Sequence, residues 1–213
     1  MEALISAFEQ DVKTIPAERF AAYQRGWDGQ LGMALIDAVF SKQMKYTTKH
    51  GRGLLPRLKI FKDLHSHAGT DLRTLITLTE QDLQASLGKG KTNGRSKASA
   101  VLEAADALVQ LGVFTATDYD HQDQTQQDAY LKVHGLGPVT HNYFGMLLGY
   151  PNVKPDRWII GAVQRVANTH ALAVKVDKTL ATTVMIETHQ RTNLGATVTH
   201  FDHAVWLTER ERT

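Results

Sequence analysis

The chain has 213 residues, of which 42% are hydrophobic and 22% are charged, and its formal net charge is +2. This composition is typical of a soluble globular protein, and no run approaches the roughly eighteen apolar residues of a membrane-spanning helix. The lack of any cysteine excludes disulfides, thiolate zinc sites, cysteine nucleophiles and cysteine-ligated iron–sulfur clusters.

Apolar residues repeat at helical spacing along nearly the whole chain, which predicts an all-α fold. The clearest core-facing stripes lie in Leu35–Phe40 and Val101–Val109, each with polar residues on the opposite side. Leu172–Val176 is predicted to connect two helices rather than to form a strand. Thr115–Gln127 is polar and acidic, and is predicted to be a surface loop with a capping turn. Further helices are predicted at Ala3–Val12, Arg57–Leu64, Glu80–Leu87, Gln126–Val133, Val139–Leu148, Trp158–Ala167, Thr179–His189 and Thr199–Thr208.

Charge is unevenly distributed along the chain. Between Lys42 and Lys97 there are twelve Lys and Arg against four Asp and Glu, whereas Ala98–Tyr130 has six acidic residues and no basic one. A basic segment of this kind can bind a phosphate backbone, and a merely solvated basic face is the alternative.

A glycine-rich turn between two predicted helices has the chemistry of a phosphate contact. Gly135-Leu136-Gly137-Pro138 links the helices, and the glycines permit positive φ and remove Cβ atoms from a tight turn. Pro138 suits the first turn of the next helix. The N–H groups at such a helix start can face an anion, which gives affinity for DNA without sequence preference.

A rigid Gly- and Pro-bearing loop, residues 149–155, follows the second helix and ends at Asp156. Asp156 stands just before an amphipathic stretch that begins near Trp158. An aspartate in this place is a helix N-cap, whose carboxylate accepts backbone N–H bonds and interacts favourably with the helix dipole. The same environment suits a catalytic carboxylate, so the two roles are compatible.

Taken together, these segments resemble the helix-hairpin-helix (HhH-GPD) DNA glycosylases of the endonuclease III-like superfamily. Val133-x-Gly135-Leu136-Gly137-x-x-Thr140 matches the hairpin, and Asp156 falls at the position of the catalytic acid. Leu35–Gln43 resembles the family's first barrel helix, and Arg95-Ser96-Lys97-Ala98 resembles its Ser-Lys-Ala helix start.

The resemblance implies two helical lobes with a DNA cleft between them. The helical barrel lobe is expected at residues 34–156, with the hairpin at 128–148, and the second lobe at residues 1–33 and 157–213. The implied activity is excision of a damaged or modified base by flipping it from the duplex and hydrolysing the N-glycosidic bond with the help of Asp156. The DNA contacts implied are Gly135, Leu136, Gly137, Val139, Thr140, Gln43, Lys45, Arg95 and Lys97, with Gln43 filling the space that the base leaves.

Aromatic side chains usually wall the pocket of a base-flipping enzyme, and aromatic residues at helical spacing are more often core. We nominate Tyr46, Tyr143 and Trp158 for the base pocket, and His141 as a pocket or phosphate contact.

Two departures from the family restrict the chemistry. Bifunctional members carry a lysine immediately before the position of Thr140, where this chain has Val139. Without that amine no Schiff base with the sugar is expected, so we predict a monofunctional glycosylase without AP-lyase activity. The lack of cysteine also excludes the family's iron–sulfur cluster. No cofactor is predicted, although a monovalent cation at the hairpin carbonyls is conceivable.

Histidine pairs raise the question of a metal site. His65-x-His67 would need a strand to direct both rings to one side, and His200 and His203 lie in a predicted helix. Neither pair matches a strong ligand pattern, so no metal is predicted.

The expected partner is double-stranded DNA, with no membrane association, and the expected state is a monomer. Met1–Gln10 lacks the basic and then apolar pattern of a secretory signal, so we expect a cytoplasmic protein, associated with the nucleoid in a bacterium. Two other readings remain open: a non-catalytic helix-hairpin-helix DNA-binding protein, and a helical protein-interaction domain.

Overall fold

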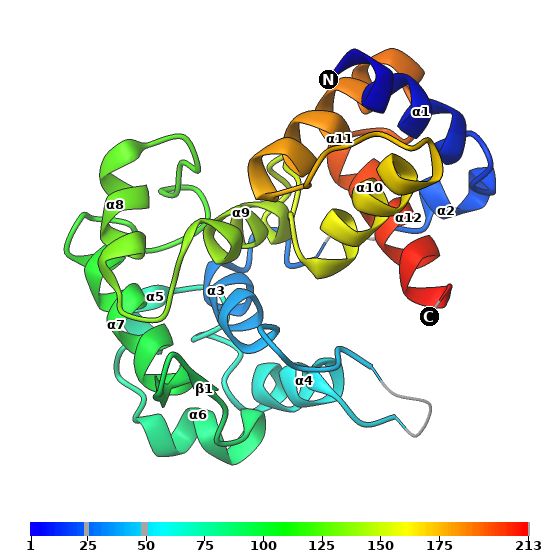
Figure 1. Cartoon of the computed structure of the whole chain (residues 1–213). Coiled ribbons are helices and arrows are strands. Elements are labelled where there is room, and N and C mark those ends of the chain that lie inside the picture. Colours follow the sequence, from blue (N-terminus) through cyan, green and yellow to red (C-terminus); the bar gives the residue numbers. More distant parts are fainter. Residues whose placement is uncertain (24–25, 48–50, 213) are drawn as a thin grey trace. The chain divides into compact units, whose positions relative to one another are not determined.

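The computed structural model describes residues 1–23, 26–47 and 51–212, and the chain forms two compact units (Figure 1). Unit 1 comprises Met1–Gln24 and Pro151–Thr213, and unit 2 comprises Arg25–Tyr150. The boundaries expected from the sequence, at residues 34 and 156, differ from these. The difference arises because Trp27 packs in the core of unit 2 and Val153 packs in the core of unit 1.

Unit 2 is built around one central helix. All ten residues of α3 (Leu31–Phe40) are buried, and α3 packs against α4, α7 and α9. A helix that is apolar on every side must be covered on every side, which explains its central place. The elements of unit 2 in chain order are α3, α4 (Leu54–Leu64), α5 (Leu72–Leu75), α6 (Glu80–Leu87), β1 (Lys91–Thr92), β2 (Arg95–Ser96), α7 (Lys97–Val109), α8 (Gln124–Lys132) and α9 (Pro138–Leu147).

A short β-hairpin precedes α7. Strands β1 and β2 pair antiparallel, with Lys91 opposite Ser96 and Thr92 opposite Arg95. The turn residues Asn93 and Gly94 both have positive φ, 48° and 84°. Asn-Gly is the preferred pair for a two-residue hairpin turn with positive φ at both positions. Asn93-Gly94 is therefore the local signal for this hairpin, which helical periodicity did not predict.

Unit 1 combines both ends of the chain. Helix α10 has a marked apolar face, which buries Ile159 and Val163 against α1 and α12. The Arg165 guanidinium on the same helix forms ion pairs with Asp11 at 2.8 Å and Glu209 at 3.1 Å, and so links the first and last helices. The helices of unit 1 are α1 (Glu2–Val12), α2 (Ala17–Ala21), α10 (Arg157–Thr169), α11 (Lys178–Thr192) and α12 (Val198–Glu211).

The all-α prediction is confirmed: apart from the two-residue strands, the regular elements of the described residues are helices. Residues 172–176 form no strand and connect α10 to α11, as predicted. The short helices α2 and α5 were not predicted, because four or five residues carry too little periodicity. None of the helices in the described part of the chain has the length and apolar character needed to cross a membrane.

Candidate functional site

Asp156 caps the N-terminus of α10, as its position in the sequence predicts. Its Oδ1 accepts hydrogen bonds from the backbone N–H groups of Trp158 at 2.8 Å and Ile159 at 3.3 Å. The carboxylate is only partly buried. The positive end of the helix dipole stabilises its negative charge, and the two hydrogen bonds hold it in a defined orientation.

Trp158, a nominated pocket residue, follows the cap in the first turn of α10. Its side chain is partly buried, and the guanidinium of Arg157 lies 4.6 Å from the centre of its ring. A cation over the ring stabilises this arrangement and occupies one face of the indole. Stacking of a base on Trp158 would therefore use its other face or displace Arg157.

The hairpin glycines have different roles. Gly135 has a φ of +95°, and a Cβ there would lie 2.8 Å from Thr92 Cγ2, so both conformation and space require glycine. Gly137 has an extended φ of −165°, which any residue can adopt, and a Cβ there would meet no atom within 4 Å. Gly135 therefore uses the positive φ that glycine permits, whereas the lack of a side chain at Gly137 leaves open space.

The start of α9 presents backbone donors beside this open space. The Gly137 N–H donates to Thr140 Oγ1 at 3.0 Å, and the Thr140 hydroxyl donates to the Gly137 carbonyl at 2.8 Å. Thr140 therefore braces the hairpin itself. The N–H groups of Val139 and Thr140 belong to the first turn, where an α-helix supplies no acceptor. These two donors are suited to an anion such as a DNA phosphate.

Leu136, between the two glycines, is partly buried and packs against the core of unit 2, where it anchors the turn.

The β1–β2 hairpin and Lys42 contact the turn between α8 and α9. The Gly135 carbonyl accepts hydrogen bonds from Thr92 Oγ1 at 2.8 Å and from Lys42 Nζ at 3.4 Å. The Arg95 guanidinium donates to the His134 carbonyl at 3.4 Å, and also forms an ion pair with Glu103 at 2.8 Å. Lys42 was not among the predicted DNA contacts. Only the fold places Lys42 beside the hairpin, because its contact with Gly135 joins residues 93 positions apart.

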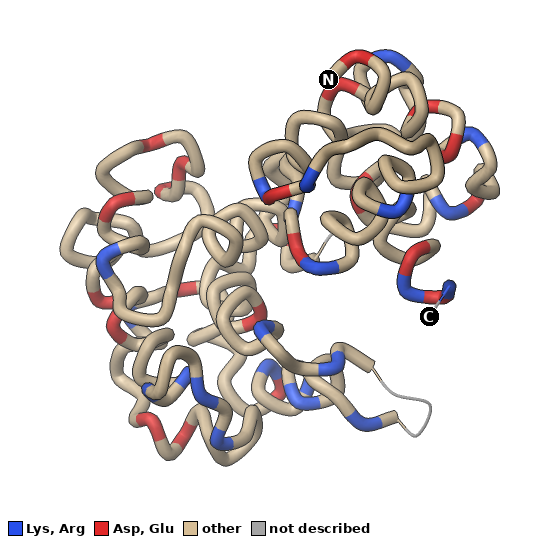
Figure 2. The backbone as a smooth tube through the Cα atoms, in the orientation of Figure 1, with Lys and Arg blue, Asp and Glu red and all other residues tan. Residues whose placement is uncertain are grey.

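Basic residues concentrate on one part of unit 2. Figure 2 shows Lys and Arg around α4 and the β1–β2 hairpin, whereas α8 and the loop before it carry acidic residues. The uneven distribution of charge along the sequence therefore corresponds to an uneven distribution of charge over the helices and strands of this unit. A local concentration of basic residues of this kind attracts a polyanion.

Lys97 has a structural role that excludes it from the predicted DNA contacts. Its side chain is 3% exposed, and its ammonium donates to the carbonyls of Phe40, at 3.0 Å, and of Lys42. Burial, together with the charge of Lys42, lowers the pKa of Lys97 to about 8. The ammonium thus satisfies carbonyls at the C-terminal end of α3 and is not available to a phosphate.

The segment after α3 contains three residues predicted to contact DNA or the base. Gln43 is exposed and has a φ of +57°, a conformation that is costly for a residue other than glycine. Lys45 is exposed, and Tyr46 is partly buried. The Tyr46 hydroxyl donates at 2.9 Å to Asp37, which is fully buried and also accepts from the Trp27 indole at 2.8 Å. The Asp37 carboxylate therefore fixes Tyr46.

His141 lies in the core of unit 2 and not at the surface. It is 1% exposed, and its ring stacks on His121 with the ring centres 4.4 Å apart. The Tyr119 hydroxyl lies 3.1 Å from His121 Nδ1 and 3.2 Å from His141 Nε2. His141 is therefore removed from the proposed base pocket. Tyr143, on the same helix, is partly buried against the core.

The buried His141, stacked on the partly buried His121, gives unit 2 a pH-dependent stability. Burial, together with the neighbouring His121, lowers the pKa of His141 from 6.5 to about 4. The unfolded chain therefore binds a proton below pH 6.5 that the folded chain does not bind until about pH 4. The stability that the neutral His141 side chain contributes is complete above pH 6.5 and is lost as the pH falls towards 4.

Through the protonation of His141 alone, we expect the free energy of unfolding to be about 2 kcal/mol lower at pH 4.5 than at pH 7. Urea unfolding of the wild type and of His141→Phe at both pH values measures it. The wild type should lose more stability than the variant between pH 7 and pH 4.5. Equal losses in the two proteins would contradict the assignment.

In the part of the chain that the structure describes, no three His, Cys, Asp or Glu residues are grouped so as to hold a metal ion. His65 packs on Phe61 with the ring centres 5.0 Å apart, and His67 is exposed. His200 Nδ1 lies 2.9 Å from Thr197 Oγ1, and His203 stacks on Trp206 with the ring centres 5.7 Å apart.

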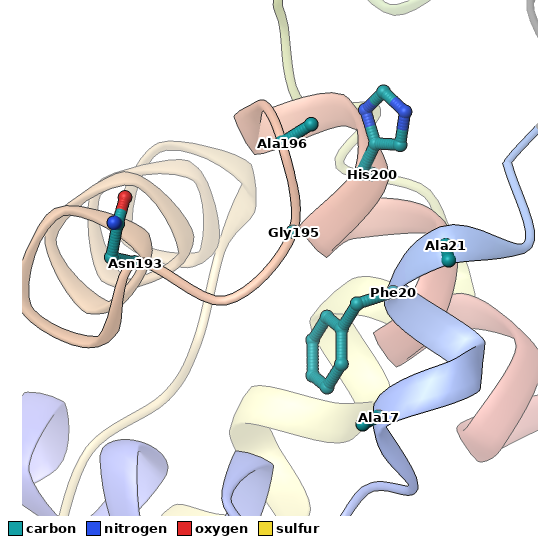
Figure 3. A pocket seen from close by; sticks show the side chains of 7 residues that line it. All are labelled: Ala17, Phe20, Ala21, Asn193, Gly195, Ala196 and His200. Atoms are coloured by element: carbon teal, nitrogen blue, oxygen red, sulfur yellow. The ribbon is translucent and has the colours of Figure 1, made fainter.

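An open hollow of about 650 Å³ lies in unit 1 between α2 and the segment that leads into α12 (Figure 3). Its lining is mainly small or apolar, and among the described residues that line it His200 is the ionisable one. None of the nominated base-pocket residues lines it. The lining residues are Ala17, Phe20, Ala21, Asn193, Gly195, Ala196 and His200.

One family model matches the chain, over residues 3–210, and its description is "Domain of unknown function (DUF8548)". Among curated proteins, none matches the chain significantly.

Three solved structures share its fold. Endonuclease III trapped in a covalent intermediate with DNA is 16% identical, with a TM-score of 0.57, over 95% of this chain and 86% of that one. MBOgg1 in complex with a low-affinity DNA ligand is 12% identical, with a TM-score of 0.55, over 85% and 60%. The Clostridium acetobutylicum 8-oxoguanine glycosylase/lyase in complex with double-stranded DNA is 11% identical, with a TM-score of 0.53, over 87% and 61%. The chain thus spans about three fifths of the length of the last two.

Proposed function

Because the chain belongs to the family described as "Domain of unknown function (DUF8548)" and has the helical fold of DNA glycosylases, we propose that it is a monofunctional DNA glycosylase. Its substrate is double-stranded DNA with a damaged or modified base. The observation that carries the proposal is the Asp156 carboxylate, which is oriented by two backbone N–H groups at the start of α10 and still reaches solvent.

The chemistry requires a carboxylate of this kind. As the N-glycosidic bond breaks, its electron pair leaves with the base, and positive charge develops on the sugar. Asp156 stabilises that charge and accepts a proton from the attacking water, whose oxygen bonds to the anomeric carbon. The products are the free base, which takes up a proton, and a strand with an abasic site.

Contacts to the DNA backbone are assigned to unit 2. The open N–H groups of Val139 and Thr140 bind a phosphate, with Gly137 leaving room for its approach. Lys42 and Arg95 add positive charge beside the same turn. Because these groups read the backbone and not base edges, they supply affinity and register without sequence preference.

Extrusion of the base is assigned to the segment after α3. Gln43 is exposed and held in a strained backbone conformation, as suits a side chain that enters the duplex. Lys45, also exposed, is proposed to contact the backbone nearby. The aromatic residues proposed for the base pocket are Tyr46, Tyr143 and Trp158.

No cofactor is proposed. The chain has no cysteine for an iron–sulfur cluster, and the Gly135 carbonyl at the hairpin already accepts from Thr92 and Lys42. The Lys42 ammonium thus lies at a carbonyl that was a candidate ligand for a monovalent cation.

Incubation with a panel of duplexes tests the proposal. The duplexes carry alkylated, oxidised, deaminated or hypermodified bases, and alkali after incubation cuts the strand at abasic sites. At least one duplex should be cut after incubation with the wild type, and none after incubation without protein.

The alternative is a DNA-binding protein without catalytic activity, and one observation favours it. Asp156 lines neither the hollow shown in Figure 3 nor a second hollow in unit 1, which lies between the start of α1 and residues 172–174. DNA binding by the wild type, with no base released from any duplex of the panel, would support this alternative.

Filling the open space at Gly137 should weaken binding to every DNA sequence by a similar factor. Gly137→Trp places a large side chain in front of the N–H donors without backbone strain. Loss of charge-assisted hydrogen bonds worth about 1.5 kcal/mol would weaken binding about tenfold. Fluorescence anisotropy on several unrelated duplexes measures the effect.

Leu111→Trp is the control, because Leu111 is an exposed residue in a loop of the same unit, 43% accessible. It should bind DNA like the wild type. A loss confined to one DNA sequence in Gly137→Trp would contradict a backbone contact.

A further inference from the structure

A second acidic residue, Asp202 on α12, lies beside the segment that carries Asp156. It is 5% exposed, and its Oδ1 accepts a hydrogen bond from the Lys154 N–H at 3.2 Å. Lys154 is two residues before Asp156. Buried acids are uncommon unless they are paired, so this residue requires an explanation.

Asp202 acts on this segment together with Thr199, which precedes it by one turn of α12. Thr199 is 3% exposed, and its hydroxyl accepts from the Asn152 N–H at 2.9 Å and donates to the Asn152 carbonyl at 3.1 Å. Val153, between the two bonded residues, is fully buried in the core of unit 1. Side chains of α12 thus hold the backbone at alternate residues just before the N-cap of α10.

The surroundings favour the uncharged form of Asp202. Burial raises its pKa well above 3.8, and the negative charge of Asp156 raises it further. The Lys154 N–H and ammonium act in the opposite direction but more weakly. Among the described residues, Asp156 and Lys154 are the charged groups that shift the pKa of Asp202. A protonated acid keeps the carbonyl oxygen that accepts from Lys154 and adds no second negative charge beside Asp156.

We propose that Asp202 is a positioning residue for Asp156. With Thr199 it fixes the backbone of residues 152–154, and this backbone sets where the Asp156 carboxylate lies at the start of α10. The role in catalysis rests on the proposed function, whereas the role in holding the segment does not.

Two substitutions separate the hydrogen bond from the charge. Asp202→Asn keeps an acceptor for the Lys154 N–H in a neutral side chain of nearly the same shape, and Asp202→Val removes the acceptor. Thr188→Val is the matched control for replacing a buried polar group by an apolar one. Thr188 is fully buried on α11 of the same unit, and its hydroxyl has no hydrogen-bond partner among the described residues.

Single-turnover base release and DNA affinity form the first measurement. Asp202→Val should release the base about tenfold to a hundredfold more slowly, because small displacements of a catalytic group have effects of this size. Its affinity for DNA should be unchanged. Asp202→Asn and Thr188→Val should retain the wild-type rate. A wild-type rate in Asp202→Val, or a rate in Asp202→Asn as low as in the valine variant, would overturn the proposal.

Amide hydrogen exchange at Lys154 tests the segment without relying on activity. Loss of one hydrogen bond should speed exchange about tenfold in Asp202→Val and leave it unchanged in Asp202→Asn. If the wild type releases no base from any duplex, the proposed function fails, and this measurement still decides whether Asp202 holds the segment. Unchanged exchange in Asp202→Val would show that it does not.

The pH dependence of unfolding tests the neutral form, and it remains informative if the valine variant does not fold. Because the pKa of Asp202 is higher in the folded than in the unfolded chain, its ionisation costs stability as the pH rises through the folded value. As the pH rises from 4 to 8, the unfolding midpoint of the wild type should therefore fall relative to that of Asp202→Asn. A difference that does not change with pH would overturn the assignment of a neutral acid.

Discussion

Asp156→Asn is expected to release the base at least about two orders of magnitude more slowly than the wild type, with folding and DNA binding unchanged. Asparagine keeps an oxygen that can accept from the Trp158 and Ile159 N–H groups, so the cap of α10 is retained. It removes the negative charge that opposes the positive charge on the sugar, and it cannot deprotonate water. Single-turnover assays on a cognate duplex, with alkali to reveal abasic sites, measure the rate.

Asp177→Asn is the matched control for this substitution. Asp177 caps α11 in the same unit, and its Oδ1 accepts from the Leu180 N–H at 2.8 Å. It should release the base at the wild-type rate, and the unfolding midpoints of the two variants should change equally little. Equal rates for Asp156→Asn and the wild type would remove Asp156 from the mechanism.

The wild type is expected to leave the DNA strand intact at the abasic site, and borohydride is expected to trap no covalent adduct. An imine requires an unprotonated amine within bonding reach of the anomeric carbon, and Val139 offers none. Lys97 has a lowered pKa of about 8, but its ammonium is buried against backbone carbonyls at the end of α3. Lys42 Nζ donates to Thr92 Oγ1 and to the Gly135 carbonyl.

Val139→Lys should gain weak trapping, because the new amine would lie in the first turn of α9. The positive end of the helix disfavours an ammonium there and lowers its pKa, which leaves part of the amine free. Gel electrophoresis after borohydride treatment, with and without alkali, distinguishes the two products. Val139→Met, which adds a long side chain without an amine, is the control and should trap nothing.

Efficient trapping by the wild-type protein would contradict the monofunctional assignment. The source of the amine could then be located, since Met1 is 66% exposed at the start of α1. Trapping that disappears when the N-terminal amine is blocked would identify Met1. Trapping that persists after blocking but disappears in Lys97→Arg would identify Lys97.

The sequence by itself determined the features that depend on neighbouring residues. Apolar spacing predicted the all-α class, and α6 begins and ends at the predicted residues, Glu80 and Leu87. The cap at Asp156 follows from its place before an amphipathic segment, and the tight turn at Gly135 follows from the glycine itself. These predictions hold because capping, turn conformation and helical periodicity are set within a few positions along the chain.

The tertiary structure decided which side chains are buried and which distant residues meet. Lys97 and His141 have sequence contexts suited to a DNA contact, but packing against α3 and His121 places them in the core. Asp202 meets the Lys154 N–H across 48 positions, and Lys42 meets Gly135 across 93. No local pattern reports such contacts, because they arise when helices that are separate in the sequence bury their apolar faces together.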